Sequence, residues 1–105
     1  MQPDQQQLTE LVRQIVEAVH PLRLVLFGSA ARGDMRADSD LDLLVVVPEG
    51  THRRHTAQFL YRHLRGVTVP FELIVATPSD LERYGRNPSL IYRAALEEGQ
   101  ALYAA

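Results

Sequence analysis

The longest apolar stretch of the sequence, Leu43 to Val47, spans only five residues. A membrane-spanning helix needs about 20 apolar residues, so this stretch predicts a buried strand rather than a membrane span. It continues an alternating segment that starts at Asp40 and stops before Pro48, which extends the predicted strand over residues 40–47. The first residues, MQPDQQQ, are polar and lack the apolar region of a signal peptide, so we expect the cytoplasm as the location.

The remaining elements are predicted from apolar spacing and from cap and turn residues. Helical spacing, with Asp4, Thr77 and Asn87 as cap residues, predicts helices. They cover residues 5–19, 52–64, 78–84 and 89–98, with a single helical turn at the start of segment 29–39. Apolar runs predict two further strands, over residues 22–27 and 67–76. This order predicts a small α/β fold, a three-stranded mixed sheet covered by helices, with strands 40–47 and 67–76 parallel.

Size and composition limit the classes of function. A chain of 105 residues with 46% hydrophobic residues builds one modest core, so we expect a single domain over residues 1–105. The net charge of -2 gives no general attraction for nucleic acid. The sequence has no cysteine, which excludes disulfides, thiolate metal sites and a cysteine nucleophile.

Three acidic residues occupy strand positions. Alternation along a strand puts the side chains of Asp40 and Asp42 on one face, and Glu72 is a lone acid in the apolar strand 67–76. Converging carboxylates repel one another unless a cation lies between them, and either an arginine or a metal ion could provide that charge. For a metal, oxygen ligands without cysteine or a nearby histidine favour Mg²⁺ or Mn²⁺ over Zn²⁺.

Gly28 and Ser29 come after the end of strand 22–27, where a backbone without bulky side chains lets N–H groups and a hydroxyl approach phosphate oxygens. Arg32, one helical turn later, could add positive charge there, or it could form a surface ion pair with Asp34 or Asp38. If strands 22–27 and 40–47 are antiparallel, the glycine-serine bend and the two aspartates lie at the same edge of the sheet.

These residues carry a resemblance to a known family. The segments Gly28-Ser29-Ala30-Ala31-Arg32-Gly33 and Asp38-Ser39-Asp40-Leu41-Asp42-Leu43-Leu44-Val45 resemble the signature of the DNA polymerase β-like nucleotidyltransferases, and most closely the minimal nucleotidyltransferases (MNT). The resemblance implies transfer of a nucleoside monophosphate to a hydroxyl with release of pyrophosphate. It also implies that Asp40, Asp42 and Glu72 hold two Mg²⁺ ions, with Mn²⁺ as the alternative, while Gly28, Ser29 and Arg32 bind the triphosphate.

The resemblance further implies a partner. MNT-like proteins are commonly paired with a HEPN-type ribonuclease toxin, so we expect an antitoxin that transfers AMP from ATP to a toxin hydroxyl, with tyrosine as the expected acceptor. The alternative is a catalytically silent antitoxin that neutralises its partner by contact alone. Transfer to a small molecule is disfavoured because no segment is large enough to build its pocket. Exposed apolar surface on the first or last helix could serve a homodimer or the toxin interface.

One helix, 52–64, carries several histidines and arginines. His52, His55 and His63 lack a further ligand for a metal site, and we expect them to lie on a solvated helix face. The arginines give this helix a basic side, which is expected to be exposed as well.

Overall fold

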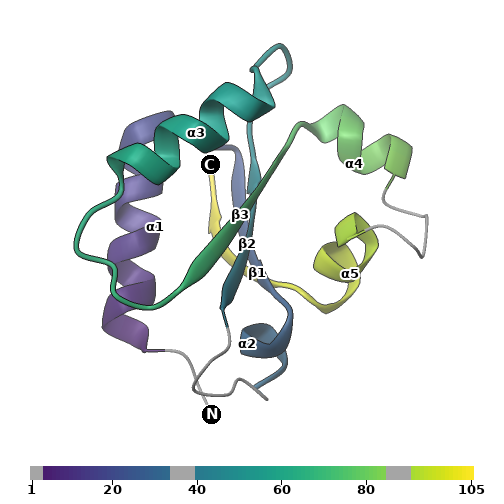
Figure 1. The fold of residues 1–105 in the computed structure, drawn as a ribbon. Coiled ribbons are helices and arrows are strands. Elements are labelled where there is room, and N and C mark those ends of the chain that lie inside the picture. Colours follow the sequence, from purple (N-terminus) through teal and green to yellow (C-terminus); the bar gives the residue numbers. More distant parts are fainter. Residues whose placement is uncertain (1–3, 34–39, 85–90) are drawn as a thin grey trace.

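The computed structural model describes residues 4–33, 40–84 and 91–105 (Figure 1). In this part of the chain, four strands form one sheet in the order β3-β2-β1-β4. The strands are β1 (Arg23–Phe27), β2 (Leu41–Val46), β3 (Phe71–Ala76) and β4 (Gln100–Ala104). β1 is antiparallel to β2 and to β4, whereas β2 and β3 are parallel. The predicted α/β class and mixed sheet are therefore confirmed.

The helices of the described residues agree with the sequence-based prediction. They are α1 (Gln5–Val19), α2 (Ser29–Arg32), α3 (Arg53–His63), α4 (Pro78–Tyr84) and α5 (Ile91–Glu98). Asp4 caps α1 as expected, because its side chain accepts hydrogen bonds from the N–H groups of Gln6 and Gln7. Within the described part of the chain, no helix is both long enough and apolar enough to cross a bilayer.

The prediction of three strands was wrong, because β4 is a fourth strand. Its sequence, Gln100-Ala101-Leu102-Tyr103-Ala104, contains two alanines and a glutamine, which carry little preference for strands. The strand is defined by its antiparallel pairing with β1, about 75 residues earlier in the chain. Such a long-range pairing leaves no local pattern in the sequence.

The strand predicted over residues 67–76 starts later than expected, at Phe71. Pro70 has no N–H to contribute to a sheet, and Gly66 takes a φ of 75°. Val67 and Val69 still pack against the core, so their apolar character reflects burial outside a strand.

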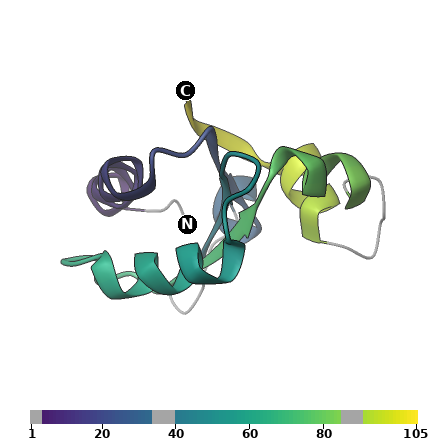
Figure 2. The ribbon, with the colours of Figure 1, turned by 90° about the horizontal axis from the view of Figure 1, so that it is seen from above.

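The sheet lies between two helical layers, which Figure 2 shows from above. One layer, α1 and α3, packs on the face that carries Leu41 and Leu43 of β2. The core cluster on this face includes Leu11, Ile15 and Leu60 of the helices. The other layer, α4 and α5, covers the opposite face, where Leu81 and Ala95 pack against the sheet. The buried sheet residues on this second face are Val25, Phe27, Leu44, Val46 and Ala76. The alternation predicted for residues 40–47 is confirmed, because odd and even positions enter different clusters.

Candidate functional site

The predicted acidic residues meet at one end of the sheet. In the parallel register of β2 and β3, Asp42 lies opposite Glu72, so both side chains leave the same face of neighbouring strands. Asp40 directly precedes β2 and shares the parity of Asp42. Asp42 is partly buried, whereas Asp40 and Glu72 are exposed. The structure therefore brings together the three carboxylates that the sequence singled out.

The bend at Gly28 touches this acidic cluster of Asp40, Asp42 and Glu72. Asp42 is paired with Phe27, the last residue of β1, and Gly28 is the next residue. Gly28 has φ 74° and ψ -156°, a combination that is essentially restricted to glycine. A Cβ atom built on Gly28 would overlap the Asp42 carboxylate oxygen Oδ2. The backbone conformation therefore requires glycine, and a side chain at this position would also displace the Asp42 carboxylate.

The single turn α2 begins at Ser29, beside the same carboxylate. Ser29 is partly buried, and the turn is closed by the Arg32 N–H, which donates to the Gly28 carbonyl at 3.2 Å. Gly33 ends the turn with φ 79°, and its N–H donates to the Ser29 carbonyl. β1 and β2 are antiparallel, which is the condition that the sequence left open, and this pairing puts the glycine-serine bend and the acidic cluster at one edge of the sheet.

The electrostatics of the cluster are visible at Asp42. Burial raises the pKa of Asp42, and the negative charges of Glu72 and Asp40 raise it further, while the Arg32 guanidinium acts in the opposite direction. Three other predicted site residues, Glu72, Asp40 and Arg32, are therefore close enough to affect the pKa of Asp42. The cluster carries an excess of negative charge that a cation would relieve.

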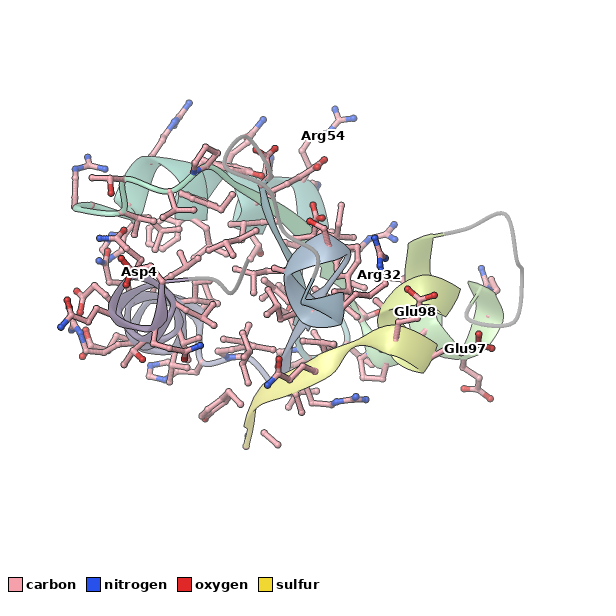
Figure 3. The ribbon with its side chains drawn as sticks, turned by 90° about the horizontal axis from the view of Figure 1, so that it is seen from below. Asp4, Arg32, Arg54, Glu97 and Glu98 are labelled. Atoms are coloured by element: carbon pink, nitrogen blue, oxygen red, sulfur yellow. The ribbon has the colours of Figure 1, made fainter. Side chains whose placement is uncertain are left out.

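Arg32 has a partner that the sequence did not indicate. Its Nη1 donates to the Glu98 carboxylate at 3.3 Å, joining α2 to the last residue of α5 (Figure 3). The two residues are 66 positions apart, so no local motif announces the pair. The alternative partners considered from the sequence, Asp34 and Asp38, lie outside the described residues.

The donor chemistry of the cluster fits a hard divalent cation, because all of its ligand atoms are carboxylate oxygens. As they stand, no three His, Asp or Glu side chains in residues 4–33, 40–84 and 91–105 are arranged to hold a metal ion. Asp40 and Glu72 are exposed, so a change of side-chain rotamer can bring them toward Asp42. The residues therefore fit Mg²⁺ in the chemistry of their oxygen atoms.

The histidines of α3 lie on its exposed side. His52 caps the helix, since its Nδ1 accepts the N–H of His55 at 3.2 Å and the two rings stack with centroids 3.8 Å apart. An open cavity of about 560 Å³ lies near this helix start, beside Arg53 and Val75. Val75 is near the end of β3 that lies away from Glu72, so this cavity is separate from the acidic cluster.

Known proteins resemble this chain in sequence family and in fold. The family described as "Nucleotidyltransferase domain" matches residues 6–102. A candidate nucleotidyltransferase from Sulfolobus solfataricus has a similar structure, with a TM-score of 0.62 and 20% identity over 94% of this chain and 78% of that one. A toxin-antitoxin structure with AMP-PNP is also similar, with a TM-score of 0.55 and 17% identity over 98% of this chain and 75% of that one. No curated protein matches the sequence. The family match extends over nearly the whole chain, and this chain therefore belongs to the nucleotidyltransferase domain family.

Proposed function

We propose that this protein is a metal-dependent nucleotidyltransferase of the minimal type, which transfers AMP from ATP to a hydroxyl group of a partner protein. Nucleotidyltransferases are typically metal-dependent and generally use Mg²⁺ and a nucleoside triphosphate. The observation that carries the proposal is the position of Asp42, which lies against the Gly28 backbone with Asp40 and Glu72 beside it.

Each residue has a role in this proposal. Asp40, Asp42 and Glu72 would hold two Mg²⁺ ions, which would neutralise phosphate charge and lower the pKa of the attacking hydroxyl. The glycine-serine bend would bind the terminal phosphates through backbone N–H groups and the Ser29 hydroxyl. Arg32 would add positive charge beside them.

The proposed reaction is a displacement at the α-phosphorus of ATP. The acceptor oxygen forms a bond to this phosphorus, and the bond from phosphorus to the oxygen bridging to the β-phosphate breaks. Pyrophosphate leaves with the bonding electron pair. The hydroxyl proton passes to a base. We propose that this base is the carboxylate of Glu72, which is exposed at the acidic cluster.

For the partner, we propose a HEPN-type toxin whose tyrosine hydroxyl receives AMP, which makes this protein an antitoxin of the cytoplasm. The structural similarity to a toxin-antitoxin complex with AMP-PNP supports this proposal. The MNT-like motifs at Gly28-Ser29 and Asp40-Leu41-Asp42 support it independently.

A second candidate function is an antitoxin that neutralises its partner by contact and has lost catalysis. The structural similarity to a toxin-antitoxin with AMP-PNP supports binding to a partner protein in this candidate as well. The two candidates differ in what happens when the central carboxylate is removed.

The experiment combines the purified protein, ATP, Mg²⁺ and the product of the neighbouring gene, and measures the mass of the partner. We expect the added mass of one AMP, and a loss of at least about a hundredfold in rate for Asp42→Asn, because the metal ligand set is incomplete. Glu17→Gln is the matched control, because Glu17 is an exposed acid of α1 that pairs with Arg13, and it should transfer AMP normally. Neutralisation of the partner by Asp42→Asn without AMP transfer would favour the second candidate.

A further inference from the structure

The ion pair between Arg32 and Glu98 links two elements that are far apart in sequence. Arg32 ends α2 beside the acidic cluster, and Glu98 ends α5. Their side chains are 48% and 50% exposed, and Nη1 of Arg32 lies 3.3 Å from the carboxylate of Glu98. Figure 3 shows Glu98 extending toward Arg32, whereas the neighbouring Glu97 lies farther away.

The end of α5 is fixed against the sheet. Ala95 is 1% exposed and packs in the same cluster as Val25 and Phe27. A Cβ atom built on Gly99 would overlap the Ala95 carbonyl and the Val25 side chain, so the backbone directly after Glu98 lies in close contact with β1. The Gly99 N–H donates to the Ala95 carbonyl at 3.0 Å. Glu98 is therefore anchored to the strand that leads into Gly28.

The backbone of Arg32 is fixed as well, because its N–H closes the α2 turn on the Gly28 carbonyl. The arginine side chain itself is long and half exposed, and such a side chain samples many rotamers in water. Its charge acts on Asp42, so the guanidinium lies within electrostatic reach of the acidic cluster. The anchored carboxylate of Glu98 pairs with the guanidinium and restricts the directions that the Arg32 side chain can take.

We propose that Glu98 is a positioning residue that holds the Arg32 guanidinium beside the glycine-serine bend, ready to receive the triphosphate of the incoming nucleotide. This inference rests on the proposed nucleotide site. The benefit is that the guanidinium is ordered before the ligand arrives, which reduces the entropy lost on binding.

If Glu98 acted only through its negative charge, its removal would change the Kd for MgATP in the opposite direction. A carboxylate near a triphosphate repels it, so removing the charge should tighten nucleotide binding if position does not matter. If Glu98 acts by orienting Arg32, removing it should weaken binding. The sign of the change in Kd for MgATP therefore separates the two effects.

The test is isothermal titration of the full chain with MgATP. We expect Glu98→Gln to raise the Kd by about two- to five-fold, the ratio that corresponds to the strength of an exposed ion pair. Glu97→Gln, which removes the same charge one residue earlier, should not raise it. An unchanged or lower Kd for Glu98→Gln would overturn the inference.

A double-mutant cycle shows whether Glu98 acts through Arg32. In the Arg32→Gln background, Glu98→Gln should no longer raise the Kd for MgATP, and an equal loss of affinity in both backgrounds would overturn the inference. Glu98→Asp keeps the charge but shortens the reach of a contact that is already 3.3 Å long. It should also weaken binding, and normal affinity in this variant would contradict a positioning role.

The outcomes also distinguish this inference from the proposed function. A wild-type chain that binds no MgATP would overturn the nucleotide site and the inference together. A wild-type chain that binds MgATP, with Glu98→Gln binding equally well, would overturn the inference alone.

Discussion

The folded chain disfavours the charged form of Asp42. It is partly buried, it has two acidic neighbours, and it lies against a glycine that leaves room for its carboxylate. The sequence was sufficient to predict this meeting of Asp40, Asp42 and Glu72, because strand alternation and parallel pairing fix which side chains share a face. It was not sufficient to predict the contact of Arg32 with Glu98, which depends on how α5 packs on the sheet.

Gly28→Ala should remove nucleotide binding. The alanine methyl group would displace the Asp42 carboxylate, and the strained backbone should destabilise the fold by about 1–3 kcal/mol. Gly50→Ala is the matched control, since Gly50 has a φ of 86° but an added Cβ there meets nothing within 4 Å. Titration with MgATP should show loss of binding in the first variant only. Equal affinity in both variants would contradict the role of Gly28 in placing Asp42.

The charge on Asp42 should cost stability at neutral pH. Because the pKa of Asp42 is raised in the folded protein, folding favours its protonated form, and the cost is relieved as the pH falls through the raised value toward 3.8. Asp42→Asn should therefore have a higher Tm than the wild type at pH 7, and the difference should shrink near pH 4. Thermal unfolding followed by circular dichroism measures both values. A lower Tm for Asp42→Asn at pH 7 would contradict this account.

At the scale of elements, α4 is held by a capping box that the sequence shows in part. Thr77 followed by Pro78 predicted the start of this helix, and the Asp80 carboxylate accepts hydrogen bonds from the Thr77 N–H at 2.9 Å and from its hydroxyl at 3.0 Å. Asp80 also pairs with Arg53 at 2.9 Å, which connects α4 to α3. The sequence was enough to predict the cap of α4. It was not enough to predict the pair of Asp80 with Arg53, because that pair depends on how α3 and α4 lie in the folded chain.

Asp80→Ala should destabilise the protein by about 1–2 kcal/mol at pH 7, the usual value for loss of a helix cap. Burial by itself would raise the pKa of Asp80, but the hydrogen bonds from Thr77 and the charge of Arg53 outweigh it and lower the pKa. The stabilisation is thus present above the ordinary value of 3.8 and is lost as the pH falls through the lowered value. Urea unfolding of both proteins at pH 7 and pH 3 tests this. A difference that stays constant at pH 3 would argue against a role of the carboxylate charge.

The strand β4 marks the limit of prediction at this scale. Gly99 was correctly expected to end the last helix, but the conformation of the residues after Gly99 depends on β1, which offers an open edge for pairing. Strand formation by Gln100–Ala104 is decided by this partner and by the packing of Leu102 and Tyr103 on the core. A pattern of a few residues with weak preferences cannot carry that information.

At the scale of the whole molecule, the two helical layers leave one end of the sheet for the acidic cluster and the bend. β1 ends there, β2 and β3 start there, and α2 and the end of α5 border it. The order of the first three strands and the motifs at their ends predict this arrangement only if β1 and β2 are antiparallel, and the structure supplies that orientation. The side-chain positions of an occupied site could not be predicted from the sequence, because they would depend on a cation that attracts the carboxylates, which otherwise repel one another.

The central claim is that the acidic cluster and the glycine-serine bend form one site for a metal-bound triphosphate. The most direct measurement is a crystal structure with Mn²⁺ and a non-hydrolysable ATP analogue, in which anomalous scattering locates the metal. We expect Mn²⁺ to be bound by Asp40, Asp42 and Glu72, with the terminal phosphates at Gly28 and Ser29. Mn²⁺ bound away from the acidic cluster would contradict this claim. A triphosphate that does not contact the bend, with Glu72 turned away from it, would contradict the claim as well.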